Sequence, residues 1–225
     1  MTRWNVPFLL GFALLPATTI AFAALPPDSA STPDVGVVFA LEFARTPADV
    51  AAALGADEPG YVERVARLRW ALGIDMGYAA LYAAFMASWA LAVSDWRRGR
   101  DRLVMLVIAL AAGAYDMSEN LLLLRVLDGQ EASLPYVRWA ARAKFAAIAF
   151  AIGYASSGFG CSPKRWRSVM QLLTLIPATL ILTSIFGGIN SLSVSILTFA
   201  TAAGWSAMWA YAGVQVWRAR SSRVA

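Results

Sequence analysis

The hydrophobic pattern divides the chain into six long apolar runs, separated by short charged turns and by one long polar segment. The runs cover residues 6–24, 70–94, 103–125, 136–157, 168–187 and 191–216. Each is close to the ~20 residues that a helix needs to cross a bilayer. We therefore predict an all-α polytopic membrane protein, a six-transmembrane-helix bundle that forms a single domain over residues 1–225, with an extracytoplasmic segment at about 25–69.

Composition and charge distribution agree with a membrane protein. Hydrophobic residues make up 59% of the chain and charged residues only 15%, against about 25% charged in soluble domains. The net charge is +5, but most of the basic residues fall on one side of the six-run arrangement, at both termini and in the second and fourth turns. Short loops rich in Lys and Arg stay in the cytoplasm. This predicts a bacterial inner-membrane protein with both termini cytoplasmic, membrane lipids as partners and no nucleic acid.

The ends of the runs carry tryptophans, as an interfacial aromatic belt does. They are Trp4, Trp96, Trp166 and Trp217 on the predicted cytoplasmic side, and Trp70 and Trp139 on the outer side. The first run has a second interpretation, because Arg3, the apolar stretch and Ala21-Phe22-Ala23 also fit a signal peptide with its cleavage site. Cleavage of residues 1–23 would leave five helices. We favour a retained helix, since the apolar run continues to Leu25.

The long polar segment contains one clear local signal. Thr46-Pro47-Ala48-Asp49 combines a hydroxyl cap, a proline at the first helical position and an acid in the first turn. This predicts a short helix to about Leu54, closed by Gly55. Before it, residues 37–44 are apolar except for Glu42 and are expected to lie in the interface or against the bundle. The segment is interpreted as a surface cap or as a lid over polar residues.

Polar side chains inside the apolar runs give the candidate ligand or proton site. They are Asp75, Tyr78 and Tyr82 in the second run, Asp116, Glu119 and Asn120 in the third, and Arg138, Arg142 and Lys144 in the fourth. Consecutive helices run antiparallel, so these groups meet near the outer leaflet. Helical spacing places the three residues of the second run on one face, and likewise the three residues of the third run. Charges in hydrocarbon are rare and are kept when paired or used.

Within this set we predict that Lys144 pairs with Asp116 or Glu119, because it is the deepest base and alanines flank it. Arg142 points to nearly the opposite side of the same helix. With three acids against two or three bases, the cluster is expected to be close to neutral. The last two runs carry no charge between Ser168 and Trp217 and are expected to act as scaffold.

Missing residue types exclude several kinds of chemistry. The chain has no histidine, which excludes histidine-ligated metals and Ser-His-Asp catalysis. One cysteine, Cys161, allows no internal disulfide. Basic neighbours disfavour a metal among the carboxylates. We predict no metal and no cofactor, assign no catalytic residue and make no prediction of the oligomeric state.

The chain resembles a group of uncharacterised bacterial multi-span membrane proteins over about residues 37–150. The resemblance rests on the motif at 46–49, on Asp75 with Tyr78 and Tyr82, on the Asp-x-x-Glu-Asn string at 116–120 and on Lys144. It implies a shared helical bundle and carries no activity.

Three functions fit these features. The leading prediction is an integral membrane protein whose charge-paired pocket near the outer leaflet binds or translocates a small polar or amphipathic molecule. The first alternative is a non-catalytic scaffold or assembly protein whose ion pairs serve the fold. The second is a lipid-modifying enzyme that uses Asp116 or Glu119 as general acid and base; of these classes we favour the non-enzymatic ones. A cavity lined by the polar groups favours binding or catalysis, whereas closed ion pairs without a cavity favour the scaffold.

Overall fold

The computed structural model describes residues 2–26, 36–93, 99–156, 164–186 and 191–222, and every regular element in these ranges is helical. The long helices are α1 (Asn5–Ala24), α4 (Tyr61–Ala92), α5 (Gly99–Leu127), α6 (Leu134–Ala155), α7 (Lys164–Phe186) and α8 (Ser191–Ser221). The short ones are α2 (Val37–Glu42), α3 (Pro47–Leu54) and the 3-10 turn η1 (Glu131–Ser133). The predicted all-α bundle is confirmed.

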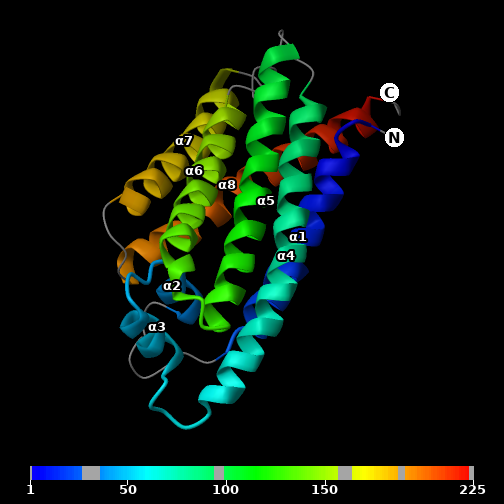
Figure 1. Cartoon of the computed structure of the whole chain (residues 1–225). Coiled ribbons are helices and arrows are strands. Elements are labelled where there is room, and N and C mark those ends of the chain that lie inside the picture. Colours follow the sequence, from blue (N-terminus) through cyan, green and yellow to red (C-terminus); the bar gives the residue numbers. More distant parts are fainter. Residues whose placement is uncertain (1, 27–35, 94–98, 157–163, 187–190, 223–225) are drawn as a thin grey trace.

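The long helices pack as a closed ring in the order α1, α4, α5, α6, α7 and α8, with α8 returning to α1 and also touching α6. Figure 1 shows both termini at one end of the bundle and α2 and α3 at the other. Helix α4 has 32 residues, a length of ~48 Å against a hydrocarbon core of ~30 Å. Its first turns therefore extend beyond the apolar region.

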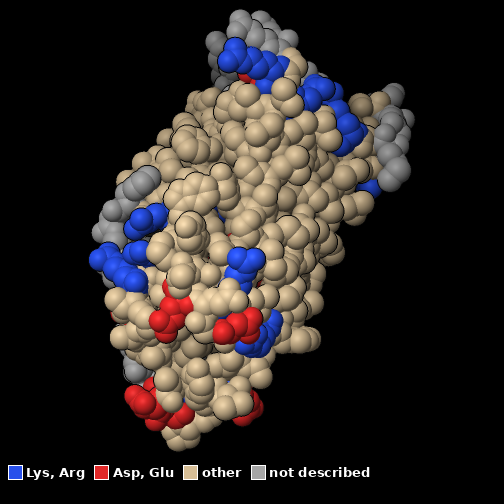
Figure 2. Space-filling view, viewed as in Figure 1, with Lys and Arg blue, Asp and Glu red and all other residues tan. Residues whose placement is uncertain are grey.

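Five helices are long and apolar enough to cross a membrane in the described part of the chain: α1, α4, α5, residues Ser168–Ile185 of α7 and Leu192–Ser221 of α8. Large apolar side chains point outward from them, for example Leu103, Leu110 and Phe199, which is 77% exposed. Figure 2 shows that much of the middle of one face has no charged side chains, with acidic groups mainly near the end that holds α2 and α3. The chain is thus a multi-pass membrane protein.

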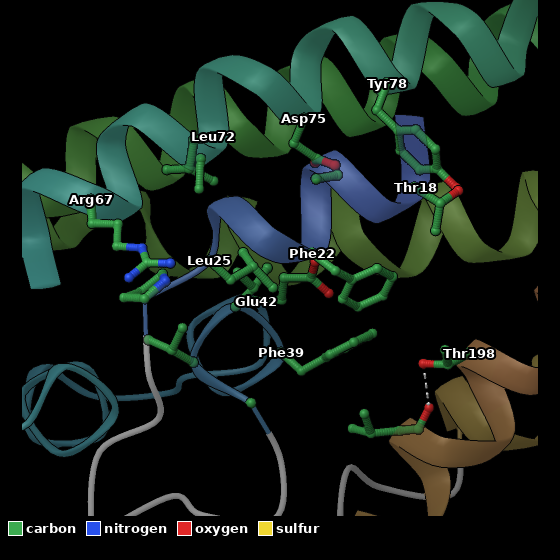
Figure 3. Close-up of a pocket in the computed structure, with 17 residues that line it drawn as sticks. Thr18, Phe22, Leu25, Phe39, Glu42, Arg67, Leu72, Asp75, Tyr78 and Thr198 are labelled. Atoms are coloured by element: carbon green, nitrogen blue, oxygen red, sulfur yellow. Dashed lines mark hydrogen bonds between the residues drawn. The ribbon is translucent and has the colours of Figure 1, made fainter. Parts of the chain in front are cut away.

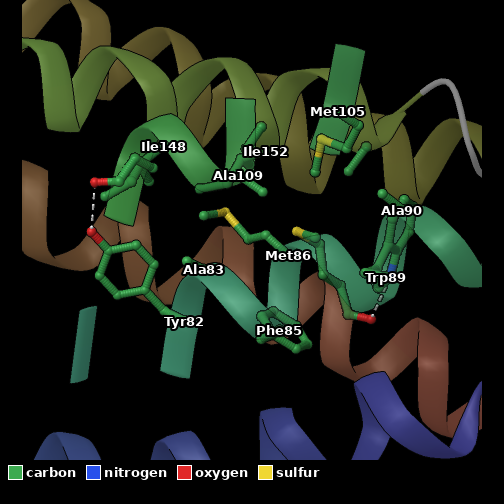
Figure 4. Packing of buried hydrophobic residues seen from close by; sticks show 14 of the residues in the cluster. Tyr82, Ala83, Phe85, Met86, Trp89, Ala90, Met105, Ala109, Ile148 and Ile152 are labelled. Atoms are coloured by element: carbon green, nitrogen blue, oxygen red, sulfur yellow. Dashed lines mark hydrogen bonds between the residues drawn. The ribbon is translucent and has the colours of Figure 1, made fainter. Parts of the chain in front are cut away.

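The core between the helices depends on small residues as well as large ones. Figure 4 shows Phe85, Met86 and Trp89 of α4 among side chains of neighbouring helices, and all three are fully buried. A Cβ on Gly113 of α5 would lie 2.8 Å from Ala83 Cβ of α4. At Gly204 of α8 it would lie 2.5 Å from an atom of Ile152 on α6. These glycines let helix pairs approach closely.

One member of the predicted aromatic belt is placed differently. Trp4 is only 7% exposed and packs edge-on against Trp89 and Tyr211, with ring centroids 5.8 and 5.3 Å apart. The prediction was wrong here because Trp4 faces the interior of the ring, not lipid. Exposed indoles are found at Trp70, Trp139 and Trp217. Trp96, Cys161 and the side chain of Trp166 lie outside the described residues.

Helix α3 forms as its sequence predicts. The Thr46 hydroxyl accepts from the Asp49 N–H, and the Asp49 carboxylate accepts from the Thr46 N–H, at 3.2 and 2.9 Å. The helix ends at Gly55, whose φ of 59° is left-handed. Arg64, on the first turns of α4, donates to the carbonyls of Leu54 and Gly55 at 3.0 and 2.9 Å. The α2–α3 segment is therefore fixed onto the end of the bundle.

Candidate functional site

A buried ammonium group lies at the centre of the polar residues. Lys144 of α6 is 6% exposed, and its Nζ lies 3.2 Å from Asp116 Oδ1. Glu119 contacts the same nitrogen with both oxygens, Oε1 at 3.0 Å and Oε2 at 2.9 Å. Glu42, at the end of α2, contacts it with Oε1 at 3.0 Å. The predicted pairing of Lys144 with the acids of α5 is confirmed, and one cation joins three helices.

Helical spacing explains why α5 supplies two of these carboxylates. Asp116, Glu119 and Asn120 recur at i, i+3 and i+4, which places them on one face, and all three are buried. Alanines on α6 beside Lys144, including Ala140 and Ala141, are buried too. Small side chains at this contact let the lysine reach the acids directly.

Hydrogen bonds extend the cluster to α4. The Tyr82 hydroxyl lies 2.8 Å from Asp116 Oδ2 and 3.1 Å from the Ala112 carbonyl oxygen. The Asn120 amide donates to Asp75 Oδ2 at 2.9 Å. Tyr78 accepts a hydrogen bond from Thr18 of α1 at 3.1 Å. Seven of the nine predicted site residues are therefore brought together, from α4, α5 and α6.

The other two, Arg138 and Arg142, do not join the cluster. Arg142 is exposed and Arg138 is half-buried, and no ion pair of either occurs among the described residues. Their positions on α6 explain this, because they lie ~120° and ~160° around the helix from Lys144. Only one base is thus presented to the acids, where two or three were expected.

Carboxyl groups therefore outnumber bases in the cluster. If every group is ionised, one ammonium faces the three carboxylates of Glu42, Asp116 and Glu119, and Asp75 adds a fourth through Asn120. An uncompensated buried charge is costly. The cluster therefore either retains protons or receives positive charge from a bound molecule.

Glu42 is the site residue that sequence reasoning missed. It is 3% exposed and comes from the segment outside the long helices. The sequence did contain an indication of its role, because Glu42 is the one charged residue in an apolar stretch. An acid is almost never fully buried without a partner. What the sequence did not indicate is which base it would meet, 102 positions away.

Two adjoining cavities flank the cluster. The outer one has a volume of about 690 Å³ and includes Arg67, Asp75 and Glu42 in its wall. Figure 3 shows Asp75 and Tyr78 on α4 above α1, with Arg67 further along the same helix beside the end of α1. The inner one has a volume of about 630 Å³ and is bounded by Asp116 and Lys144. Shared wall residues join them: Thr18, Phe22, Phe39, Tyr78 and Thr198.

Helices expected to be scaffold form part of these walls. Thr198, Thr201 and Trp205 of α8 line the inner cavity, and the Trp205 ring stacks on Tyr82 with centroids 5.2 Å apart. The prediction for the last run rested largely on its lack of charge, whereas cavity walls are mostly apolar and aromatic. Helix α1 contributes to both cavities, so its retention matters for the site.

Comparison of the chain with protein-family models, curated proteins and solved structures gives no match. Fold and site together define a class of protein: a multi-pass helical-bundle membrane protein with a buried charge cluster beside two cavities. The resemblance noted from the sequence stays a prediction, and function is argued from the geometry.

Proposed function

We propose that the protein binds an amphipathic molecule within the membrane, as a carrier or receptor that moves it between the bilayer and the outer face. The observation that supports this is the pair of adjoining cavities, whose polar groups lie mainly in the outer one. A closed set of ion pairs serving only the fold would leave no such space. Each cavity has a volume typical of ligand sites, ~300–1,000 Å³.

The wall chemistry suggests how such a molecule would lie. Charged groups of the outer cavity, Arg67, Asp75 and Glu42, suit a polar head group. Much of the inner cavity is hydrocarbon and aromatic, including Phe85, Ile148, Leu197 and Trp205. An apolar tail would occupy this part and pass beside Lys144.

The scaffold function remains the second candidate, and one observation favours it. Lys144 ties α2, α5 and α6 together through three carboxylates. Loss of these ion pairs would remove a contact that holds the three helices together. The two functions differ in what they require of the cavities, since only the first needs them open.

Filling the cavity provides the test. Thr198 lines both cavities, whereas its neighbour Phe199 is 77% exposed on the outer surface. We expect Thr198→Trp to reduce the lipid retained by the purified protein, measured by native mass spectrometry after incubation with dioctanoyl phospholipids. Phe199→Trp is the matched control and should retain lipid as the wild type does. Equal retention by both variants, or no retention by the wild type, would contradict the proposed function.

We further propose that α6 crosses the bilayer as a sixth span, with the termini in the cytoplasm of a bacterial inner membrane and α2 and α3 outside. Supporting this, α6 packs between α5 and α7, and its lysine is compensated by acids. A membrane-impermeant maleimide provides the test in intact cells. Cys161 should react only after lysis, whereas Asp128→Cys, made in a Cys161→Ser background, should react from outside. Labelling of both from the same side would contradict a crossing by α6.

A further inference from the structure

The outer cavity contains hydrogen-bond acceptors that have no donor. Glu42 lines this cavity. Its Oε1 accepts from Lys144, but its Oε2 is buried without a hydrogen-bond partner. Asp75 lines the same cavity, and the only hydrogen bond recorded for it among the described residues comes from the Asn120 amide. Carboxylates only accept hydrogen bonds when ionised, so a ligand bound by these two acids has to supply the donors.

Positive charge on the donor would also offset the charge of the acids. One ammonium faces three carboxylates in the cluster, with Asp75 close to it. Arg67 also borders this cavity, but it donates to the carbonyls of Ala23 and Ala24 at 2.9 and 3.3 Å. It lies eight residues before Asp75, which is ~12 Å along α4. Its guanidinium is therefore already hydrogen-bonded to the end of α1.

From these observations we infer that the site selects an amphipathic molecule whose head group is a primary ammonium, held by Glu42 and Asp75. This inference rests on the proposed function and names its ligand class. The cluster already shows the fit of such a group, since the Lys144 ammonium is surrounded by carboxylate oxygens at 2.9 to 3.2 Å. A primary ammonium brings one positive charge and three N–H donors. A quaternary ammonium brings the charge without the donors.

A metal ion fits the same acids less well. The described residues contain no group of three or more acidic, cysteine or histidine side chains arranged to hold one. The Lys144 ammonium also occupies the point where the carboxylates converge, and it would repel a second cation placed there. The free acceptors instead lie towards the outer cavity, where a head group enters.

The experiment compares two lipids that differ only at the nitrogen. Dioctanoyl phosphatidylethanolamine and dioctanoyl phosphatidylcholine share tails, phosphate and net charge, but only the first has N–H donors. We expect the wild type in maltoside detergent to bind the ethanolamine lipid about tenfold more tightly by native mass spectrometry titration, since hydrogen bonds to charged groups are among the stronger ones. Dodecylammonium, tested as a competitor, distinguishes between two sources of the ammonium group. Displacement of the lipid would show that a free alkylamine is enough for binding. Failure to displace it would assign the site to the aminophospholipid.

Two variants connect the preference to the cavity. Asp75→Asn should reduce the difference between the lipids to about threefold or less, because it removes charge and acceptor capacity while keeping the shape. Asp128→Asn is the control: this acid pairs with Arg69 at the surface, with its side chain 53% exposed, and it should leave the preference unchanged.

The outcomes separate this inference from the proposed function. Equal binding of the two lipids by the wild type would overturn the ammonium inference and leave cavity binding intact. Tighter binding of dioctanoyl phosphatidylglycerol than of the ethanolamine lipid would overturn it too. A preference that survives Asp75→Asn unchanged would overturn the assignment to this wall. Absence of binding by every lipid would contradict the proposed function itself.

Discussion

Replacing Lys144 by methionine tests whether one cation balances the buried acids. Methionine has a similar length but no charge, so Glu42, Asp116 and Glu119 lose the partner that lies 2.9 to 3.2 Å away. Removing one partner of a buried ion pair costs about 3–5 kcal/mol. For a chain of this length a loss of 1 kcal/mol lowers Tm by ~2–4 °C. We expect Tm to fall by roughly 6–20 °C.

Neutralising one acid should have a much smaller effect. In Asp116→Asn the amide oxygen still accepts from Lys144, and the new N–H group donates to the Tyr82 hydroxyl. That hydroxyl in turn donates to the Ala112 carbonyl oxygen, which it already contacts. The substitution also lowers the excess of negative charge. We expect stability to change by about 1 kcal/mol or less in either direction. Glu119→Gln should cost more, because both Glu119 oxygens contact the ammonium and an amide offers only one acceptor.

The assay is thermal unfolding in maltoside detergent, followed by tryptophan fluorescence. Arg142→Met is the control, since this base is exposed and exposed substitutions usually change stability by ~0.5 kcal/mol or less. Adding Asp116→Asn to Lys144→Met should restore part of the lost stability. The reasoning is refuted if Lys144→Met unfolds at the temperature of Arg142→Met, or if Asp116→Asn destabilises as much as Lys144→Met.

Three further predictions concern the cap of α3 and the contact between α4 and α5. The N–H groups of Arg45 and Thr46 hold the pKa of Asp49 below its usual value. Amide-exchange protection of α3 should therefore persist above pH ~4 and fall only as the pH drops through the lower folded-state pKa of Asp49. Thr46→Ala removes the hydroxyl cap and should cost about 1 kcal/mol of stability. Gly113→Leu should cost about 1–3 kcal/mol in the same unfolding assay, because it pushes α5 away from Ala83, whereas Gly77→Leu has no atom within 4 Å of its Cβ and should be tolerated.

Much of the architecture and part of the site could be predicted from the sequence, because those features depend on local pattern. Apolar runs of bilayer length predicted six long helices, and a four-residue motif predicted where α3 begins. The spacing of Asp116, Glu119 and Asn120 predicted a polar face on α5. The cost of a charge in hydrocarbon predicted that Lys144 would meet those acids.

Only the tertiary structure decided the composition and shape of the site. Glu42 reaches Lys144 because α2 folds back over the end of the bundle, and the two arginines of α6 are excluded by the direction in which that helix faces its neighbours. The cavities exist because α1 and α8 close the ring beside α4 and α6. Local pattern sets which face of a helix is polar, but the partner of that face depends on which helices are adjacent, and adjacency is set by packing between residues far apart in the chain.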